Sequence, residues 1–205
     1  SNIITTGTGA GRFAIYFYGT GNTNGTLTNI TSNDTTGNSV RLQNFTTLSV
    51  ASFNLGGTNA FGLLVENSSS VNISTGTIGS AGKLTVGGAS HDVTIEGVTI
   101  SGGYGFWAEG TSYNIIYNDC LSEDGLDEGY TIRTGAYNVT YNRCTANNNT
   151  GTGFKVLDNA SGINYYDCQS NNNTNNGFDT DAGTTTLSPD GVNYYRCSAS
   201  YNGTV

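Results

Sequence analysis

The chain has 205 residues, a formal net charge of −8 and only seven Lys and Arg residues, which argues against nucleic acid as a partner because phosphate neutralisation needs clustered basic side chains. No apolar run approaches the length of a membrane helix and no signal peptide is visible, so we expect no membrane span. Glycine is abundant (30) and proline occurs once, but regularly spaced Ile, Val and Leu indicate ordered short strands rather than disorder.

Residues 1–35 form the least regular part of the chain. They contain one convincing strand, Arg12 to Tyr18, in which Phe13, Ile15 and Phe17 alternate with Ala and Tyr. From about Leu27 onward we expect strands of roughly three to five residues, separated by Gly, Asn and Ser, with no helical periodicity. These strands are predicted within residues 39–45, 47–55, 60–67, 70–75, 83–88, 92–101 and 105–110.

The second half of the chain repeats every 24 residues. A fixed period shared by several residue types predicts a repeat architecture. Sandwiches and barrels use longer strands joined by hairpins, whereas a rigid period suits a coil of three short strands and three turns. The recurring residues are Tyr117, Tyr141 and Tyr165; Cys120, Cys144 and Cys168; and Phe106, Tyr130, Phe154 and Phe178.

We therefore predict an all-β protein, a right-handed parallel β-helix (β-solenoid) of about eight coils stacked about 4.8 Å apart. Residues 1–205 are expected to form one domain, with a less regular part at 1–35, stacked coils at 36–205 and an open C-terminal end. Stacking predicts three kinds of ladder. They are aliphatic (Ile115, Val139, Ile163, Val192), aromatic (the three tyrosines, then Tyr194) and alternating in charge (Asp119, Arg143, Asp167, Arg196).

Two further features concern turns. Asn147–Asn149 recur as Asn171–Asn173, which predicts an asparagine turn ladder. The last tyrosine interval is 29 residues rather than 24, so about five extra residues are expected in a loop at 184–190.

The four cysteines, Cys120, Cys144, Cys168 and Cys197, fall in register. They suit either a ladder of buried thiols or disulfides between coils, since vertical neighbours lie within disulfide range. Metal binding by them is not expected, because His91 is the only histidine and no Cys-X-X-Cys motif is present.

Charged residues gather beside the glycine-aromatic turns of three consecutive coils. They are Glu123, Asp124, Asp127 and Glu128; then Lys155; then Asp179 and Asp181. Four carboxylates within six residues suit Ca²⁺, and a lysine one coil away is expected to have a lowered pKa and to abstract a proton α to a carboxylate. The competing interpretation is a solvated turn with a surface lysine. Trp107, Tyr104 and Tyr130 are similarly either a sugar-stacking platform or scattered aromatics.

The strings E-D-G-L-D, N-R-C-T-A-N-N-N, G-F-K, D-C-Q-S-N-N-N and N-G-F-D, in that order, resemble the family 9 polysaccharide lyases, which are β-helical pectate lyases. The resemblance covers about residues 112–180. It implies that Glu123, Asp124 and Asp127 bind Ca²⁺ and that Lys155 is the catalytic base. The chain departs from the family pattern at Glu123, where Asp is usual, and at Tyr104, where the family tends to supply a further calcium-binding Asp.

Eleven Asn-X-Ser/Thr sequons are consistent with a glycosylated, secreted or surface protein. They begin at Asn24, Asn29, Asn33, Asn44, Asn67, Asn72, Asn138, Asn148, Asn159, Asn172 and Asn202.

Two functions follow from these patterns. The first is an extracellular structural protein of a cell surface or appendage, which stacks head to tail with itself or contacts other cell-surface components, because open solenoid ends expose unpaired backbone. The second is a Ca²⁺-dependent lyase that cleaves an acidic polysaccharide by β-elimination with Lys155 as base. No cofactor other than Ca²⁺ is expected. Carbohydrate-binding adhesins and tailspike-like proteins are further alternatives.

Overall fold

The computed structural model of the chain describes residues 3–5, 13–19, 24–33, 38–56, 61–181 and 188–203. Every regular element in these ranges is a β-strand, and every pairing between strands is parallel. Within this part of the chain, no helix is long and apolar enough to cross a membrane.

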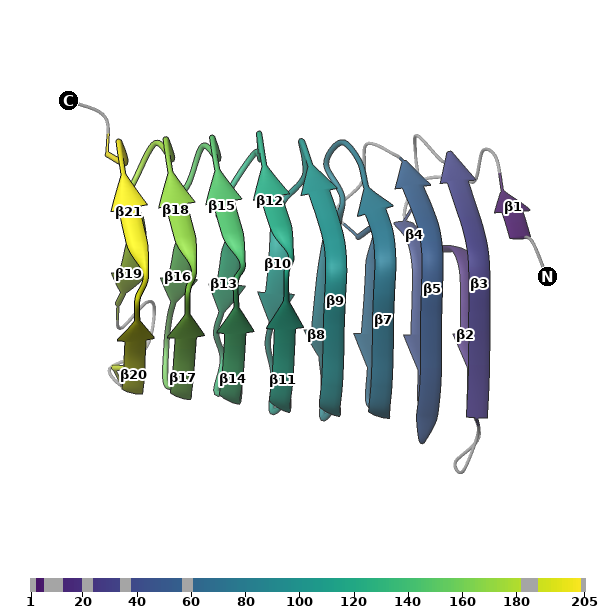
Figure 1. The fold of residues 1–205 in the computed structure, drawn as a ribbon. Helices are drawn as coiled ribbons and strands as arrows, with labels where there is room; N and C mark the ends of the chain where they lie inside the picture. Colours follow the sequence, from purple (N-terminus) through teal and green to yellow (C-terminus); the bar gives the residue numbers. More distant parts are fainter. Residues whose placement is uncertain are drawn as a thin grey trace.

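The strands form two sheets that face each other along the whole molecule (Figure 1). The main strands of the first sheet are β1 (Ile3–Thr5), β3 (Asn24–Asn33), β5 (Thr47–Gly56), β7 (Ser69–Ile78), β9 (His91–Ser101), β11 (Tyr113–Asn118), β14 (Tyr137–Asn142), β17 (Ser161–Tyr166) and β20 (Asp190–Tyr195). The first sheet continues in β12 (Leu121–Glu123), β15 (Thr145–Asn147), β18 (Gln169–Asn171) and β21 (Ser198–Ser200). The second sheet contains β2 (Phe13–Tyr18), β4 (Asn38–Gln43), β6 (Leu63–Glu66), β8 (Lys83–Gly87), β10 (Gly105–Ala108), β13 (Tyr130–Ile132), β16 (Phe154–Val156) and β19 (Phe178–Thr180).

The chain alternates between the two sheets and advances by one strand at each return, which makes a parallel β-helix and confirms the predicted all-β solenoid. The eight strands of the second sheet correspond to seven full turns, close to the expected number of coils. Hydrogen bonds between coils therefore run along the rod axis. Coil length varies from 21 residues (Leu63 to Leu84) to 25 (Ile15 to Val40) and settles at 24 from Phe106 onward.

Each coil is shaped by left-handed residues at its corners. One such column, with φ between 50° and 60°, bends the first sheet in every described coil: Asn29, Ser52, Thr75, Gly97, Asp119, Arg143, Asp167 and Arg196. In the N-terminal coils, pairing continues on both sides of the bend. The strands β3, β5, β7 and β9 are therefore 10 or 11 residues long, and the predicted length of three to five residues was wrong for them. From β11 onward the bend separates two shorter strands, which gives the predicted three-strand coil.

The core lies between the sheets and confirms the predicted ladders. Ile115, Val139, Ile163 and Val192 pair in register. The tyrosine column stacks at 4.7 Å (Tyr117 to Tyr141) and 5.0 Å (Tyr141 to Tyr165) with nearly parallel rings. A second column, Phe106, Tyr130, Phe154 and Phe178, stacks at 4.5–4.9 Å and meets the first edge to face.

The cysteines adopt the thiol form of the predicted ladder. Cys120, Cys144 and Cys168 are buried free thiols, and Cys197 is a partly buried one. The Cys144 and Cys168 thiols donate to backbone carbonyls of the preceding coil, at 3.4 Å from Tyr117 O and 3.5 Å from Tyr141 O. Burial raises the pKa of Cys144 well above its ordinary value, so this thiol stays protonated.

The polar ladders also form between coils. Asn171 Nδ2 donates to Asn147 Oδ1 at 3.1 Å, as the asparagine repeat predicted. The alternating charges resolve into two separate bidentate pairs: Arg143 with Asp119 (2.7 Å for both bonds) and Arg196 with Asp167 (2.6 and 2.7 Å). The predicted loop at 184–190 lies mostly outside the described residues, as does Arg12 at the start of the first predicted strand.

Candidate functional site

The predicted catalytic lysine lies on the outer face of the second sheet. Trp107, Thr131, Lys155 and Asp179 occupy equivalent outward positions on β10, β13, β16 and β19. Their neighbours in the strands, the Phe106 column, point inward. This alternation places every second residue of these short strands on the surface, in a row along the rod.

Lys155 is paired with a carboxylate from the preceding coil. Its Nζ lies 2.8 Å from Glu128 Oε1, and both side chains are mostly buried. The hydrogen bond to Glu128 raises the pKa of Lys155, outweighing the burial that lowers it. The prediction of a lowered lysine pKa was therefore wrong, because the acidic cluster supplies a direct partner to the ammonium group.

Asp127 and Glu128 respond in opposite ways to the same surroundings. Burial, followed by the hydrogen bond and charge of Glu128, raises the pKa of Asp127 from 3.8 to about 6. Burial also opposes ionisation of Glu128, but hydrogen bonds from Asp127 and Lys155 outweigh it and lower the pKa of Glu128. Near neutral pH the three groups form a proton-sharing unit in which Asp127 holds the most weakly acidic carboxyl.

The carboxylates implied as calcium ligands are not brought together. Glu123 ends β12 in register with Ser101 and Asn147, and Asp124 accepts a hydrogen bond from Asn148 Nδ2 at 3.1 Å. Asp127 follows in the turn toward β13. In the part of the chain that the structure describes, no three His, Cys, Asp or Glu side chains lie close enough to hold a metal ion. The residues present therefore do not fit the Ca²⁺ site that the resemblance implies.

Trp107 is surrounded by cations. Lys83 Nζ lies 3.8 Å and Arg133 Cζ 4.1 Å from its ring centroid, and the two cations come from the preceding and the following coil. Arg133 also pairs with Glu109 at 3.0 Å. Burial lowers the pKa of Lys83, partly offset by the charge of Glu109. Sequence reasoning missed these cations, although the coil spacing places each of them beside Trp107.

The predicted sugar-stacking platform is not formed. Tyr130 is buried in the core, and its hydroxyl donates to Cys120 O at 2.7 Å. The Trp107 ring is occupied by Lys83 and Arg133, and its Nε1 donates to Tyr104 O at 2.8 Å. Neither ring is presented as a flat, free surface.

A family model described as "right handed beta helix region" matches residues 13–192. The chain belongs to the right-handed β-helix family. No curated protein matches the chain. Among solved structures, a candidate glycosyl hydrolase from Parabacteroides merdae is similar at 10% identity, with 78% of each chain covered and a TM-score of 0.48. This level of similarity carries no argument about what this β-helix does.

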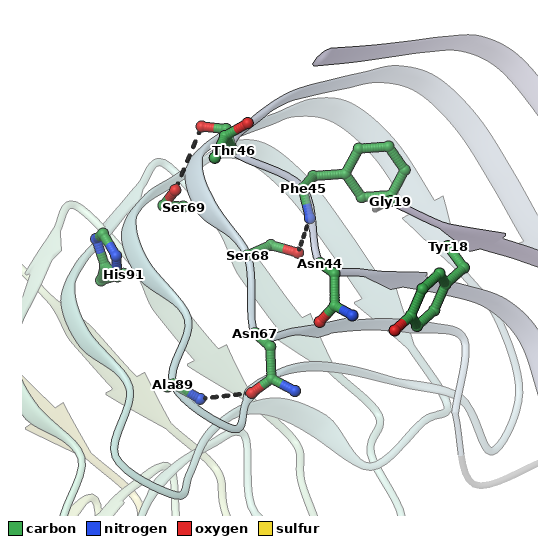
Figure 2. Close-up of a pocket in the computed structure, with 10 residues that line it drawn as sticks. All are labelled: Tyr18, Gly19, Asn44, Phe45, Thr46, Asn67, Ser68, Ser69, Ala89 and His91. Carbon is green, nitrogen blue, oxygen red and sulfur yellow. Dashed lines mark hydrogen bonds between the residues drawn. The ribbon is translucent and has the colours of Figure 1, made fainter. Parts of the chain in front are cut away.

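The β-helix has an open groove of about 400 Å³ at the corner where the second sheet leads back to the first (Figure 2). It is lined by Tyr18, Gly19, Asn44, Phe45, Thr46, Asn67, Ser68, Ser69, Ala89 and His91. Gly19, Asn44 and Asn67 occupy equivalent positions in three successive coils, each directly after a paired strand residue. Sequence reasoning missed this groove because it lies in the half of the β-helix where coil length varies.

The sequon asparagines lie mostly on the surface of the β-helix. Asn24, Asn29, Asn67, Asn72, Asn138, Asn148, Asn159 and Asn172 are exposed, Asn44 and Asn202 are half-buried, and the side chain of Asn33 is outside the described part. Six of them have left-handed backbone: Asn29, Asn44, Asn67, Asn138, Asn148 and Asn172. Many sequons thus coincide with corner positions, because asparagine tolerates this conformation well.

Proposed function

We propose that this β-helix is a structural rod of an extracellular surface or appendage. The observation that carries the proposal is the pairing of its candidate catalytic group. Lys155, the predicted base, is held in an ion pair with Glu128 that favours its protonated form. A protonated lysine has no lone pair with which to accept a proton. Along the same face, Arg41 is paired with Glu66 and Arg133 with Glu109, so its charges also join neighbouring coils.

The packing of the rod supports the same role. Aliphatic, aromatic, thiol and amide columns run from coil to coil, so each coil is specified mainly by its neighbours. The outer surface is rich in short polar side chains, and eight described sequon asparagines are exposed, as suits an extracellular protein.

The proposal includes stacking with a second copy. Tyr194 and Tyr195 of β20 stack on Tyr165 and Tyr166 at 5.0 and 4.7 Å, and each remains 44% exposed. Another β-coil, from the same chain or from a second copy, would cover these rings and extend both columns. We propose the second copy, because a head-to-tail contact between rods need not close into a ring and therefore builds filaments.

Light scattering and negative-stain microscopy across a concentration series test this proposal. We expect filaments that lengthen with concentration, and we expect Tyr194→Lys to shorten them by placing a charge in the stacking surface. Tyr137→Lys is the matched control, because Tyr137 is 42% exposed but lies on the flank of a central coil. Monomers at every concentration would contradict self-stacking, and a compact shape in X-ray scattering would contradict the rod.

The second candidate function is cleavage of an acidic polysaccharide, and one observation favours it. Asp127, whose pKa is raised to about 6, lies beside Glu128 and Lys155 on an outward face, and perturbed groups of this kind concentrate in functional sites. In β-elimination, Lys155 would first have to leave Glu128 and lose its own proton. It would then remove the proton α to the sugar carboxylate, as a C–C double bond forms and the glycosidic C–O bond breaks. Asp127 would donate a proton to the leaving oxygen.

Absorbance near 235 nm with polygalacturonate, with added Ca²⁺ and with chelator, tests this second candidate. Activity that Lys155→Ala abolishes and Lys83→Ala spares would establish it, because Lys83 lies on the same face but contacts Trp107 instead. No unsaturated product from the wild-type protein in either condition would dismiss this polygalacturonate lyase activity. The scattering experiments are independent of this outcome.

A further inference from the structure

We propose that Asn67 carries an N-linked glycan whose first sugars lie in the groove beside Tyr18. This inference rests on the proposed extracellular location, because glycan transfer to sequons belongs to exported proteins. Asn67 begins the sequon Asn67-Ser68-Ser69 and is exposed on the groove. Among the eleven sequons, only those of Asn44 and Asn67 begin in the lining of this groove.

The orientation of the Asn67 amide is fixed in a way that suits modification. Its Oδ1 accepts a hydrogen bond from the backbone N–H of Ala89 at 3.1 Å. Its Nδ2, the atom to which a sugar is joined, has no hydrogen-bond partner among the described residues and points into the groove on the side of Asn44 and Tyr18 (Figure 2). Attachment of a glycan at Nδ2 therefore leaves the existing hydrogen bond intact.

Two other exposed sequons differ in this respect. Asn138 Nδ2 donates to Asn114 Oδ1 at 2.6 Å, and Asn148 Nδ2 donates to Asp124 Oδ1 at 3.1 Å. Both bonds join successive coils. A glycan at either nitrogen removes one of its two hydrogens and crowds the neighbouring side chain, so it competes with a contact of the native ladder.

The groove offers space and surface for the attached sugars. Gly19, which has no side chain, stands where the next coils have Asn44 and Asn67, so the column opens toward the N-terminal coil. Tyr18 is 58% exposed beside this opening and gives an aromatic face on which a sugar can pack. The hollow of about 400 Å³ is large enough for sugar rings but remains open to solvent for the rest of the glycan.

Asn44 is the competing acceptor. It precedes Asn67 by one coil, is half-buried and begins the sequon Asn44-Phe45-Thr46. A sugar with its substituents is wider than the roughly 4.8 Å between coils, so two glycans cannot occupy both positions of the column comfortably. We expect Asn67 to be modified in preference and Asn44 to be modified when Asn67 is removed.

Glycopeptide mass spectrometry of the full chain, secreted from a host that modifies Asn-X-Ser/Thr sequons, tests the assignment. We expect high occupancy at Asn67 and lower occupancy at Asn138 and Asn148. Ser69→Ala should abolish modification of Asn67, and Asn67→Gln should raise occupancy at Asn44. An unmodified Asn67, whether or not other sequons are occupied, would overturn the assignment. Rod shape and self-stacking are measured on unglycosylated protein, so their failure is separate.

Release of the glycan from folded protein by an N-glycosidase tests its placement in the groove. Tyr18→Ala is expected to leave occupancy unchanged and to speed release about fivefold, since one aromatic packing contact is lost. Tyr16→Ala is the matched control, because Tyr16 is similarly exposed on the same strand but bonds Gln43 at 2.7 Å. Equal release rates from wild type and Tyr18→Ala would overturn the placement.

Discussion

At the scale of single residues, chemically equal side chains differ because of what the neighbouring coil brings to them. Asp127 and Asp119 are both aspartates before a coil contact, yet the pKa of Asp127 is raised by burial and Glu128, whereas that of Asp119 is lowered by its hydrogen bond with Arg143. The sequence placed all these residues near the correct coil. It could not give the direction of either shift, which depends on side-chain contacts about 24 residues apart in the chain.

Asp127→Asn should remove a pH dependence of stability. Asp127 titrates near 3.8 when unfolded and near 6 when folded, so the folded protein binds more protons between these values and stability falls as pH rises across that window. Allowing for the half-exposure of this side chain, we expect Asp127→Asn to gain about 1 kcal/mol at pH 7 and little at pH 4. Urea unfolding at both pH values measures this.

Asp119→Asn is the control with the opposite sign. The lowered pKa of Asp119 contributes stability above its unfolded pKa, which is lost as pH falls. Its replacement should therefore weaken the protein at pH 7 and not strengthen it. A destabilised Asp127→Asn at pH 7 would show that the carboxylate is better accommodated than its surroundings indicate.

The buried tyrosine hydroxyls differ in what they contact. The Tyr141 hydroxyl is buried without a hydrogen-bond partner among the described residues, whereas Tyr130 donates to Cys120 O at 2.7 Å. Tyr141→Phe should therefore stabilise the protein by about 1 kcal/mol, and Tyr130→Phe should destabilise it by a similar amount. Thermal unfolding of both variants tests this pair. Equal effects in the two would mean that the Tyr141 hydroxyl finds a partner in solution.

At the scale of elements, the turns between β15 and β16 and between β18 and β19 show how the ladders hold the corners. Asn149 is buried, accepts from Gly125 N at 3.1 Å and donates to Asn173 Oδ1 at 2.9 Å. One side chain thus satisfies backbone in the coil below and an amide in the coil above. Its neighbour Asn148 points outward and is exposed.

Asn149→Ala should cost about 2–3 kcal/mol, because it leaves buried hydrogen-bonding groups of two coils without partners. Asn148→Ala, an exposed change in the same turn, should cost less than about 0.5 kcal/mol. Urea unfolding followed by circular dichroism measures both. Similar losses in the two variants would contradict a special role for the inward amide.

Elements were predictable to the extent that the repeat is regular. From Phe106 onward the 24-residue spacing predicts which residues lie above one another, and the structure confirms these columns. In the first half, coil length changes between 21 and 25 residues, so no fixed spacing marks the corresponding columns. The charged face and the groove were missed for related reasons, since Lys83, Arg133 and Asn67 meet their partners only after the coils are aligned.

At the scale of the whole molecule, one coil is a unit that the fold tolerates losing. Residues 137–160 span one period, and Tyr137 pairs with Ser161, the first residue after them. Their deletion joins Ala136 to Ser161 and keeps the aliphatic, tyrosine and cysteine columns in register. It also brings Asp119 under Asp167, so a modest loss of stability is expected.

We expect this shortened chain to remain folded, with a rod shorter by about 4.8 Å in X-ray scattering. Deletion of residues 137–148 alone removes half a period and should unfold the C-terminal coils, because every later inward residue loses its column. Circular dichroism compares the two. Equal folding of both deletions would show that register between coils does not specify this rod.

Because the hydrogen bonds between coils run along the rod axis, a pulling force applied to its two ends opens them one coil at a time instead of shearing many together. Each released coil of 24 residues, which spans one strand spacing when folded, extends to about 80 Å. In force spectroscopy we expect a series of small, evenly spaced rips at low force. A single large rip would contradict coil-by-coil opening. A rod built in this way lengthens many times over before it breaks, so it can absorb mechanical load as an extensible tether.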